Sequence, residues 1–141
     1  MARFNVDLGE NAWKKQLLAL GWLMTAPGLP VVYSGTELGM KGYAVGDVSG
    51  ESQDYLNRLP YPEAPSDEQM RQKQQFVELT NLRNQYPALS QGDFKELYKD
   101  WSIYAYVRGW GDEKILTCLN NAATQEFISI PLPYGMNISE I

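Results

Sequence analysis

A side chain that could do chemistry lies in PGLPVVYSGTELGMKG, residues 27–42, which carries Glu37 shortly after an apolar run. Pro30 followed by the run Val31–Tyr33 is typical of a short strand that is buried on both faces. The small polar residues and glycines after this run predict a loop. In parallel α/β folds the loops that follow the strands carry the ligand-binding groups on a rigid scaffold. Glu37 is therefore a candidate site residue by position.

The composition restricts any chemistry to carboxylates. The 141 residues include no histidine and a single cysteine, Cys118, so the chain has no imidazole base, no internal disulfide and no thiolate metal cluster. Twelve basic and seventeen acidic residues give a net charge of -5, without the basic surface that nucleic acid or anionic lipid selects. We expect no nucleic-acid partner, no membrane partner and no cofactor, and calcium binding by a longer parent protein is left open.

The class of protein follows from hydropathy. Hydrophobic residues make up 44% of the chain and charged residues 21%, which is typical of a soluble globular protein with a real core. The longest apolar stretch, residues 16–35, is interrupted by Gly21, Pro27 and Pro30, so it predicts no membrane span. Residues 1–10 do not have the pattern of a signal peptide.

Two helices are expected to support the candidate loop. The segment 11–26 has apolar residues at spacings of four, three and four, which predicts a helix with one buried stripe: Trp13, Leu17, Leu20 and Met24. A capping box of Ser66 with Gln69 opens a second helix that Pro87 ends. Its apolar positions are Met70, Phe76, Leu79, Leu82 and Tyr86. The glycine- and proline-rich segment 41–65 between them is typical of a functional or disordered loop.

Beyond residue 90 the apolar period changes from helical to two. This alternation predicts antiparallel strands over residues 101–109, 114–121 and 126–133, the first two joined by a turn at Gly111 and Asp112. We interpret the alternating aromatic residues as a half-buried sheet face rather than as a sugar platform: Trp101, Tyr104, Tyr106 and Trp110. The remaining candidates for packing are interpreted as core residues: Tyr33, Met24, Met40, Met70 and Cys118.

Four segments in order resemble the α-amylase family of glycoside hydrolases. GLPVVYSGTELGMKG, DYLNR, LRNQYPALSQGDF, and IYAYVRG with KILTCLNN are similar to the last barrel strand, its loop, the final barrel helix and the start of the C-terminal domain. The resemblance is nearest to bacterial maltodextrin-cleaving members such as cyclomaltodextrinases and neopullulanases. It implies an α/β plus all-β fold: the C-terminal end of a TIM (β/α)8 barrel over residues 1–89, followed by an incomplete antiparallel β-sandwich domain over residues 90–141.

The resemblance also implies an activity for the parent protein. Members of the family cleave α-glucosidic bonds with retention, using a carboxylate nucleophile and a carboxylic acid roughly 5 Å apart. Arg3 and Phe4 resemble the Arg-Phe that follows the family's last catalytic aspartate, so we expect the catalytic carboxylates upstream and none in this chain. The implied partner is an α-glucan such as starch, a maltodextrin or a cyclodextrin. The parent's location, bacterial cytoplasm or secreted, stays open.

Three residues take roles from the resemblance. Glu37 matches a structural carboxylate beneath the sugar site, whereas Asp54 and Arg58 match a pair that holds sugar hydroxyls on the non-reducing side of the cut. The alternative is that Arg58 merely pairs with Asp54 on a solvated loop. The stretch YAVGDVSGESQ before Asp54 is longer than in the family members compared.

Two other functional hypotheses remain. The chain could be part of a non-catalytic amylase-like partner protein, or an inactive expressed fragment, and the sequence upstream of Met1 would distinguish an enzyme from a partner protein. One strand and two helices cannot close a barrel. We therefore expect the isolated fragment to self-associate through its uncovered apolar faces.

Overall fold

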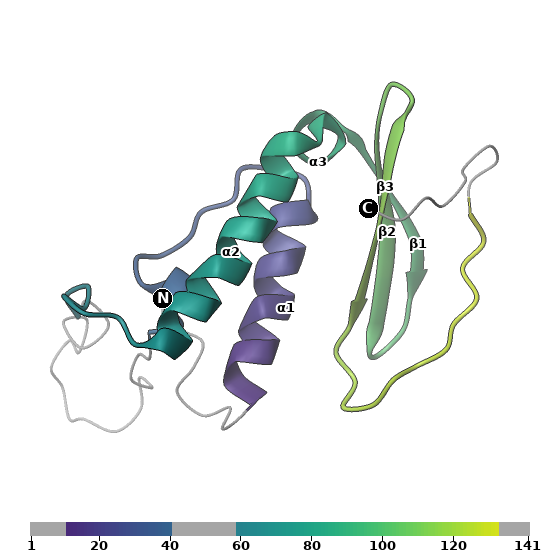
Figure 1. Cartoon of the computed structure of the whole chain (residues 1–141). Coiled ribbons are helices and arrows are strands. Elements are labelled where there is room, and N and C mark those ends of the chain that lie inside the picture. Colours follow the sequence, from purple (N-terminus) through teal and green to yellow (C-terminus); the bar gives the residue numbers. More distant parts are fainter. Residues whose placement is uncertain (1–10, 41–58, 133–141) are drawn as a thin grey trace, which may run out of the picture.

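The computed structural model describes residues 11–40 and 59–132. The helical part consists of α1 (Ala12–Thr25), the 3-10 turn η2 (Thr36–Leu38), α2 (Asp67–Gln85) and α3 (Pro87–Gln91). One antiparallel sheet follows, with the order β1 (Asp93–Lys99), β2 (Ile103–Trp110), β3 (Glu113–Asn120). In Figure 1, α1 and α2 lie side by side, the sheet stands on the other side of α1, and α3 connects α2 to the sheet. The fold is a small α/β piece with a three-stranded sheet.

Both expected helices are present. In α1, Leu20 and Met24 are buried as predicted, and Gln16 shares their stripe at 3% exposure. Trp13 and Leu17 are partly buried. None of the helices within the described residues is long and apolar enough to cross a membrane.

The capping box of α2 is confirmed. The Ser66 side chain accepts a hydrogen bond from the Gln69 N–H at 3.2 Å, and the Gln69 side chain accepts one from the Ser66 N–H at 2.9 Å. The buried residue of this helix is Arg83, whereas Met70 is 49% exposed, so the core assignment of Met70 is wrong. Pro87 follows the end of α2 and also begins α3, because the first position of a helix needs no N–H donor.

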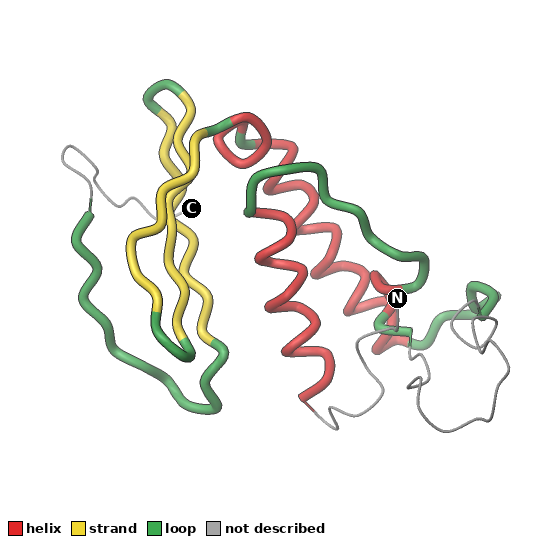
Figure 2. The backbone as a smooth tube through the Cα atoms, turned by 180° about the vertical axis from the view of Figure 1, so that it is seen from behind, coloured by secondary structure: helices red, strands yellow, loops and turns green. Residues whose placement is uncertain are grey.

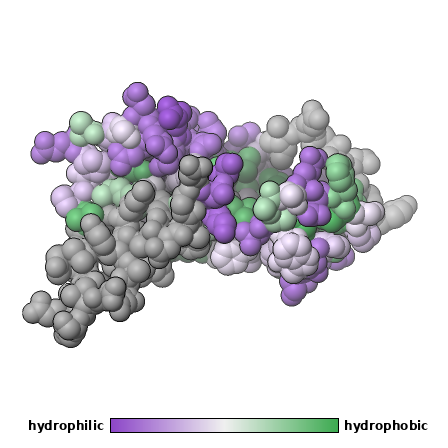
Figure 3. Space-filling view, turned by 90° about the horizontal axis from the view of Figure 1, so that it is seen from below, coloured by the Kyte–Doolittle hydropathy of each residue, from purple (hydrophilic) through white to green (hydrophobic). Residues whose placement is uncertain are grey.

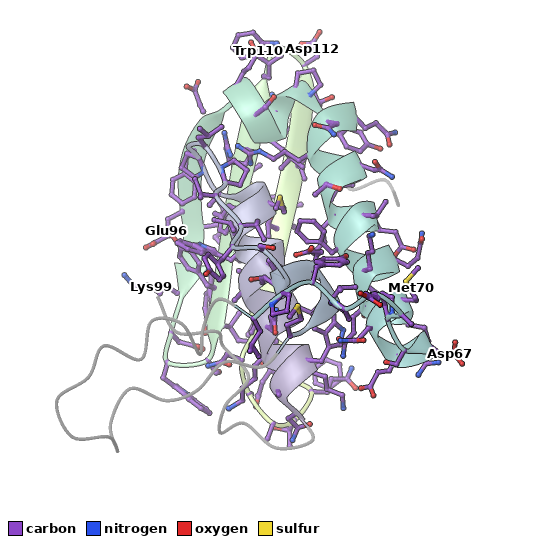
Figure 4. All side chains as sticks on the ribbon, turned by 90° about the vertical axis from the view of Figure 1, so that its left-hand side faces the viewer. Asp67, Met70, Glu96, Lys99, Trp110 and Asp112 are labelled. Carbon is purple, nitrogen blue, oxygen red and sulfur yellow. The ribbon has the colours of Figure 1, made fainter. Side chains whose placement is uncertain are left out.

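The hairpin of β2 and β3 agrees with the predicted alternation and turn. Trp110 pairs with Glu113 across the two-residue turn, and Gly111 has a φ of 56° at the first central position, where a type II′ turn requires glycine. Figure 4 shows Trp110 and Asp112 at this tip of the sheet. Strand β1 was not among the predicted strands. Its side chains are exposed along most of its length, so it lacks the apolar alternation by which a strand is recognised.

Two of the predicted strands are wrong. Val31 is 79% exposed and Tyr33 40% exposed, and their segment forms no strand. A strand buried on both faces needs neighbouring strands, and the described residues provide none beside it. Residues 126–132 are likewise loop, with Phe127 89% exposed. Figure 2 shows this segment running outside the sheet.

The predicted aromatic face is only partly correct. Tyr106 is fully buried and Tyr104 partly buried, whereas Trp110 is 50% exposed and Trp101, in the turn between β1 and β2, is 84% exposed. Cys118 is exposed rather than part of the core. Ile115, three residues earlier on β3 and therefore on the opposite face of the sheet, is buried.

Candidate functional site

The structure describes one of the three predicted site residues. Glu37 lies in η2, the turn that follows the extended segment after α1. Asp54 and Arg58 lie outside the described residues.

A set of short backbone hydrogen bonds builds the loop around Glu37. The N–H groups of Gly39 and Met40 donate to the carbonyls of Thr36 and Gly35, at 3.0 and 2.9 Å. Gly35 and Gly39 have φ angles of 84° and 62°, in the left-handed region that favours glycine. Leu38 between them is fully buried. The glycines predicted as a loop therefore form a compact turn with an apolar anchor.

Both long helices hold this turn. Gln16 of α1 donates from Nε2 to the Thr36 carbonyl at 2.7 Å. On the α2 side, a Cβ atom added at Gly39 would collide with the side-chain oxygen of Gln72, so the turn lies directly against that helix. The side-chain oxygen of Gln16, Oε1, is buried and has no hydrogen-bond partner among the described residues.

The described residues enclose the side chain of Glu37 only in part. Its side chain is half-buried, and none of the described residues forms an ion pair with it. The described residues also contain no group of His, Cys, Asp or Glu side chains that could hold a metal ion. Its structural role beneath a sugar site stays a prediction.

The sequence did not predict that two arginines, Arg83 and Arg108, are buried. They lie at the end of α1, where the segment that leads to Glu37 begins. Arg83 of α2 donates from Nη1 to the carbonyls of Met24 at 2.7 Å and Ala26 at 3.1 Å. Its Nη2 donates to the Gly28 carbonyl at 2.6 Å. Arg83 thus fixes the chain where it leaves α1.

Arg108 of β2 makes a similar set of contacts from the sheet. Its Nη1 donates to the carbonyls of Thr25 and Leu89, both at 2.9 Å. Nη2 donates to Gly92 O at 2.8 Å, and Nε to Asp93 O at 3.3 Å. Burial, and then the nearby charge of Arg83, lower the pKa of Arg108. Guanidinium stays protonated in proteins, so this side chain is a buried cation.

A hydroxyl pair adds to this junction. The Thr25 Oγ1 and Tyr106 Oη atoms are 2.6 Å apart, so one hydroxyl donates to the other. Burial raises the pKa of Tyr106, which keeps its hydroxyl protonated. The sequence gives little warning of these contacts. Thr25 and Arg108 stand in apolar stretches, whereas Gln16 and Arg83 each have charged or polar neighbours.

The chain was compared with known proteins, and no family model matches it. It is 31% identical over 115 residues to the Beta/alpha-amylase of Paenibacillus polymyxa, covering 79% of this chain and 8% of that protein. It is 27% identical over 133 residues to Neopullulanase 2 of Thermoactinomyces vulgaris, covering 93% of this chain and 21% of that protein.

A solved α-amylase structure is also similar to this chain. The α-amylase of Geobacillus thermoleovorans, complexed with acarbose, aligns with a TM-score of 0.65 at 30% identity, over 79% of this chain and 22% of that one. The helices and sheet described above therefore align with a small part of an α-amylase structure. The chain belongs to the α-amylase family of glycoside hydrolases. It spans 8%, 21% and 22% of these three proteins, less than a quarter of each.

Proposed function

We propose that this chain is the C-terminal part of an α-amylase-type glycoside hydrolase that acts on α-glucans with a retaining mechanism. The observation that carries the proposal is the alignment with the Geobacillus thermoleovorans α-amylase, which was solved with acarbose bound. Neopullulanase 2 among the relatives supports a maltodextrin-cleaving type. Residues 1–89 would belong to the catalytic barrel and residues 90–141 to the following β domain.

Within this proposal the chain supplies support and sugar contacts. Asp54 and Arg58 hold hydroxyls of a sugar next to the reacting ring, because a charged pair can orient several hydroxyls at once. Glu37 is a structural carboxylate near that site. The nucleophile and the general acid lie outside this chain, so the chain alone has no hydrolase activity.

The sugar contact is tested in the full-length parent protein with Arg58→Ala. Removing the guanidinium leaves Asp54 and the sugar hydroxyls without their hydrogen bonds, a loss of about 2 to 4 kcal/mol in transition-state binding. We expect kcat/KM to fall about 30-fold or more on long maltooligosaccharides. The fall should be smaller on short substrates that leave the subsite empty. Arg71→Ala, which removes an exposed arginine of α2, is the matched control.

Two outcomes would contradict the proposal. If kcat/KM of Arg58→Ala stays within about twofold of the parent on long substrates, a change of about 0.4 kcal/mol, Arg58 is only a surface partner of Asp54. If the isolated chain still releases reducing ends from maltooligosaccharides after repurification, the nucleophile and the general acid lie within this chain.

A further inference from the structure

The end of α1 is held by cations that belong to other elements. The last carbonyls of any helix have no partner within the helix and form the negative end of its dipole. Helix α1 has no basic residue of its own in its last turn. Arg83 of α2 and Arg108 of β2 instead donate to four carbonyls in and just after this turn, those of Met24, Thr25, Ala26 and Gly28.

These two arginines are buried without an ion-pair partner among the described residues. Arg83 is 9% exposed and Arg108 is 1% exposed, and neither forms an ion pair within the described part of the chain. A buried charge is costly unless its hydrogen bonds are satisfied. Here backbone carbonyls satisfy them, so each guanidinium depends on the backbone staying in place. The dependence is mutual, because removing a guanidinium leaves those carbonyls buried without donors.

Arg108 links its own strand to three other segments of the fold. From β2 its guanidinium reaches the end of α1 at Thr25, the short helix α3 at Leu89, and the start of β1 at Gly92 and Asp93. Figure 1 shows that these segments meet where α3 connects the helices to the sheet. The Thr25–Tyr106 hydroxyl pair adds a second link between α1 and β2.

We infer that Arg83 and Arg108 form a clamp on the end of α1, through which the helices and the sheet open as one cooperative unit. We call this pair the arginine clamp. It crosses residue 89, where a domain boundary is proposed, so the two parts on either side of that boundary do not unfold independently. The inference does not depend on the proposed catalytic function.

The clamp is tested by amide hydrogen exchange, read by mass spectrometry, on the full 141-residue chain carrying Arg108→Met. Methionine keeps much of the side-chain volume but removes the donors. We expect protection to fall at least tenfold in β2 and also in residues 20–28 at the end of α1. Lys114→Met, on the neighbouring strand β3, is the control, because Lys114 is exposed and its ammonium donates to the Gly111 carbonyl in the hairpin turn. It should leave residues 20–28 unchanged.

The reverse experiment starts from the helices. Arg83→Met removes three hydrogen bonds made by α2, and by the same coupling it should lower protection in β2, with exposed Arg71→Met as its control. If circular dichroism shows that a methionine variant does not fold, the lysine variant at the same position, Arg108→Lys or Arg83→Lys, replaces it. Lysine keeps the positive charge but cannot donate several hydrogen bonds in the planar geometry of a guanidinium group. The inference is overturned if Arg83→Met lowers protection only in the helices and Arg108→Met lowers protection only in the sheet.

Discussion

At the scale of single residues, Asp100 shows how one carboxylate organises a turn. Its Oδ1 accepts from the N–H groups of Ile103 at 2.6 Å and Ser102 at 2.8 Å, and its Oδ2 accepts from the Tyr98 hydroxyl at 2.9 Å. The N–H of Ile103, followed by that of Ser102, lowers the pKa of Asp100. The same carboxylate raises the pKa of Tyr98. The ionised form of Asp100 is therefore the one that the turn between β1 and β2 binds.

This predicts how stability depends on pH. Because folding lowers the pKa of Asp100, its contribution is fully present above its unfolded pKa of about 3.9 and is lost as pH falls through the folded pKa. Asp100→Ala should thus lower the urea midpoint at pH 7 and at pH 5, and the difference from wild type should shrink at pH 3. The measurement is urea unfolding at one protein concentration.

Asp112→Ala is the matched control, because the structure shows no side-chain hydrogen bond for Asp112 within the described residues. A difference between wild type and Asp100→Ala that is as large at pH 3 as at pH 7 would show that the turn does not depend on the charge.

At the scale of elements, the two long helices are terminated in different ways. Helix α2 begins with its own capping box, Ser66 with Gln69, and acidic residues Asp67 and Glu68 in its first turn complement its dipole. Helix α1 has no side-chain cap at its start and no cation of its own at its end. Its end therefore relies on tertiary contacts, whereas the start of α2 is a local structure.

The local nature of the α2 cap can be measured. Ser66→Ala removes the acceptor for the Gln69 N–H and should cost about 1 kcal/mol of unfolding free energy. Ser90→Ala is the control, since that hydroxyl donates to Pro87 O within α3 and caps no N–H. In the double variant with Gln69→Ala the two losses should not add, because the two hydrogen bonds are reciprocal. Strictly additive losses would contradict the capping box.

At the scale of the whole molecule, large apolar side chains remain in contact with solvent. Four of them are at least 79% exposed and all lie outside the helices and strands: Leu29, Val31, Trp101 and Phe127. Figure 3 shows apolar surface among hydrophilic residues on the sheet side of the molecule. The edge strand β1 is guarded by a bulge between Glu96 and Tyr98 and by lysines, as edge strands commonly are, and Figure 4 places Glu96 and Lys99 on this edge.

We expect the isolated chain to self-associate through this apolar surface. Sedimentation velocity should show species larger than a monomer that grow with concentration, together with binding of a hydrophobic dye. Leu29→Glu combined with Val31→Glu should reduce both signals, whereas Lys99→Glu, at the charged edge of β1, should not. A monodisperse monomer that binds little dye would contradict the expectation.

The sequence by itself determined the features that local chemistry controls. Ser66, Gln69 and Pro87 predict the limits of α2, and Gly111 predicts the hairpin turn, because a cap or a tight turn depends on a few adjacent residues. The glycines beside Glu37 likewise predict its loop. Such signals hold whatever the rest of the chain does.

The tertiary structure alone decided the burial of residues whose type suggests the opposite. The apolar run at Val31 predicts a buried strand. A strand forms only when another strand lies beside it, and the described residues supply none there. Conversely, no sequence signal predicted that Arg83 and Arg108 are buried, but the end of α1 offers carbonyls that accept their hydrogen bonds. Burial depends on which distant segments meet, and residue type alone does not specify that meeting.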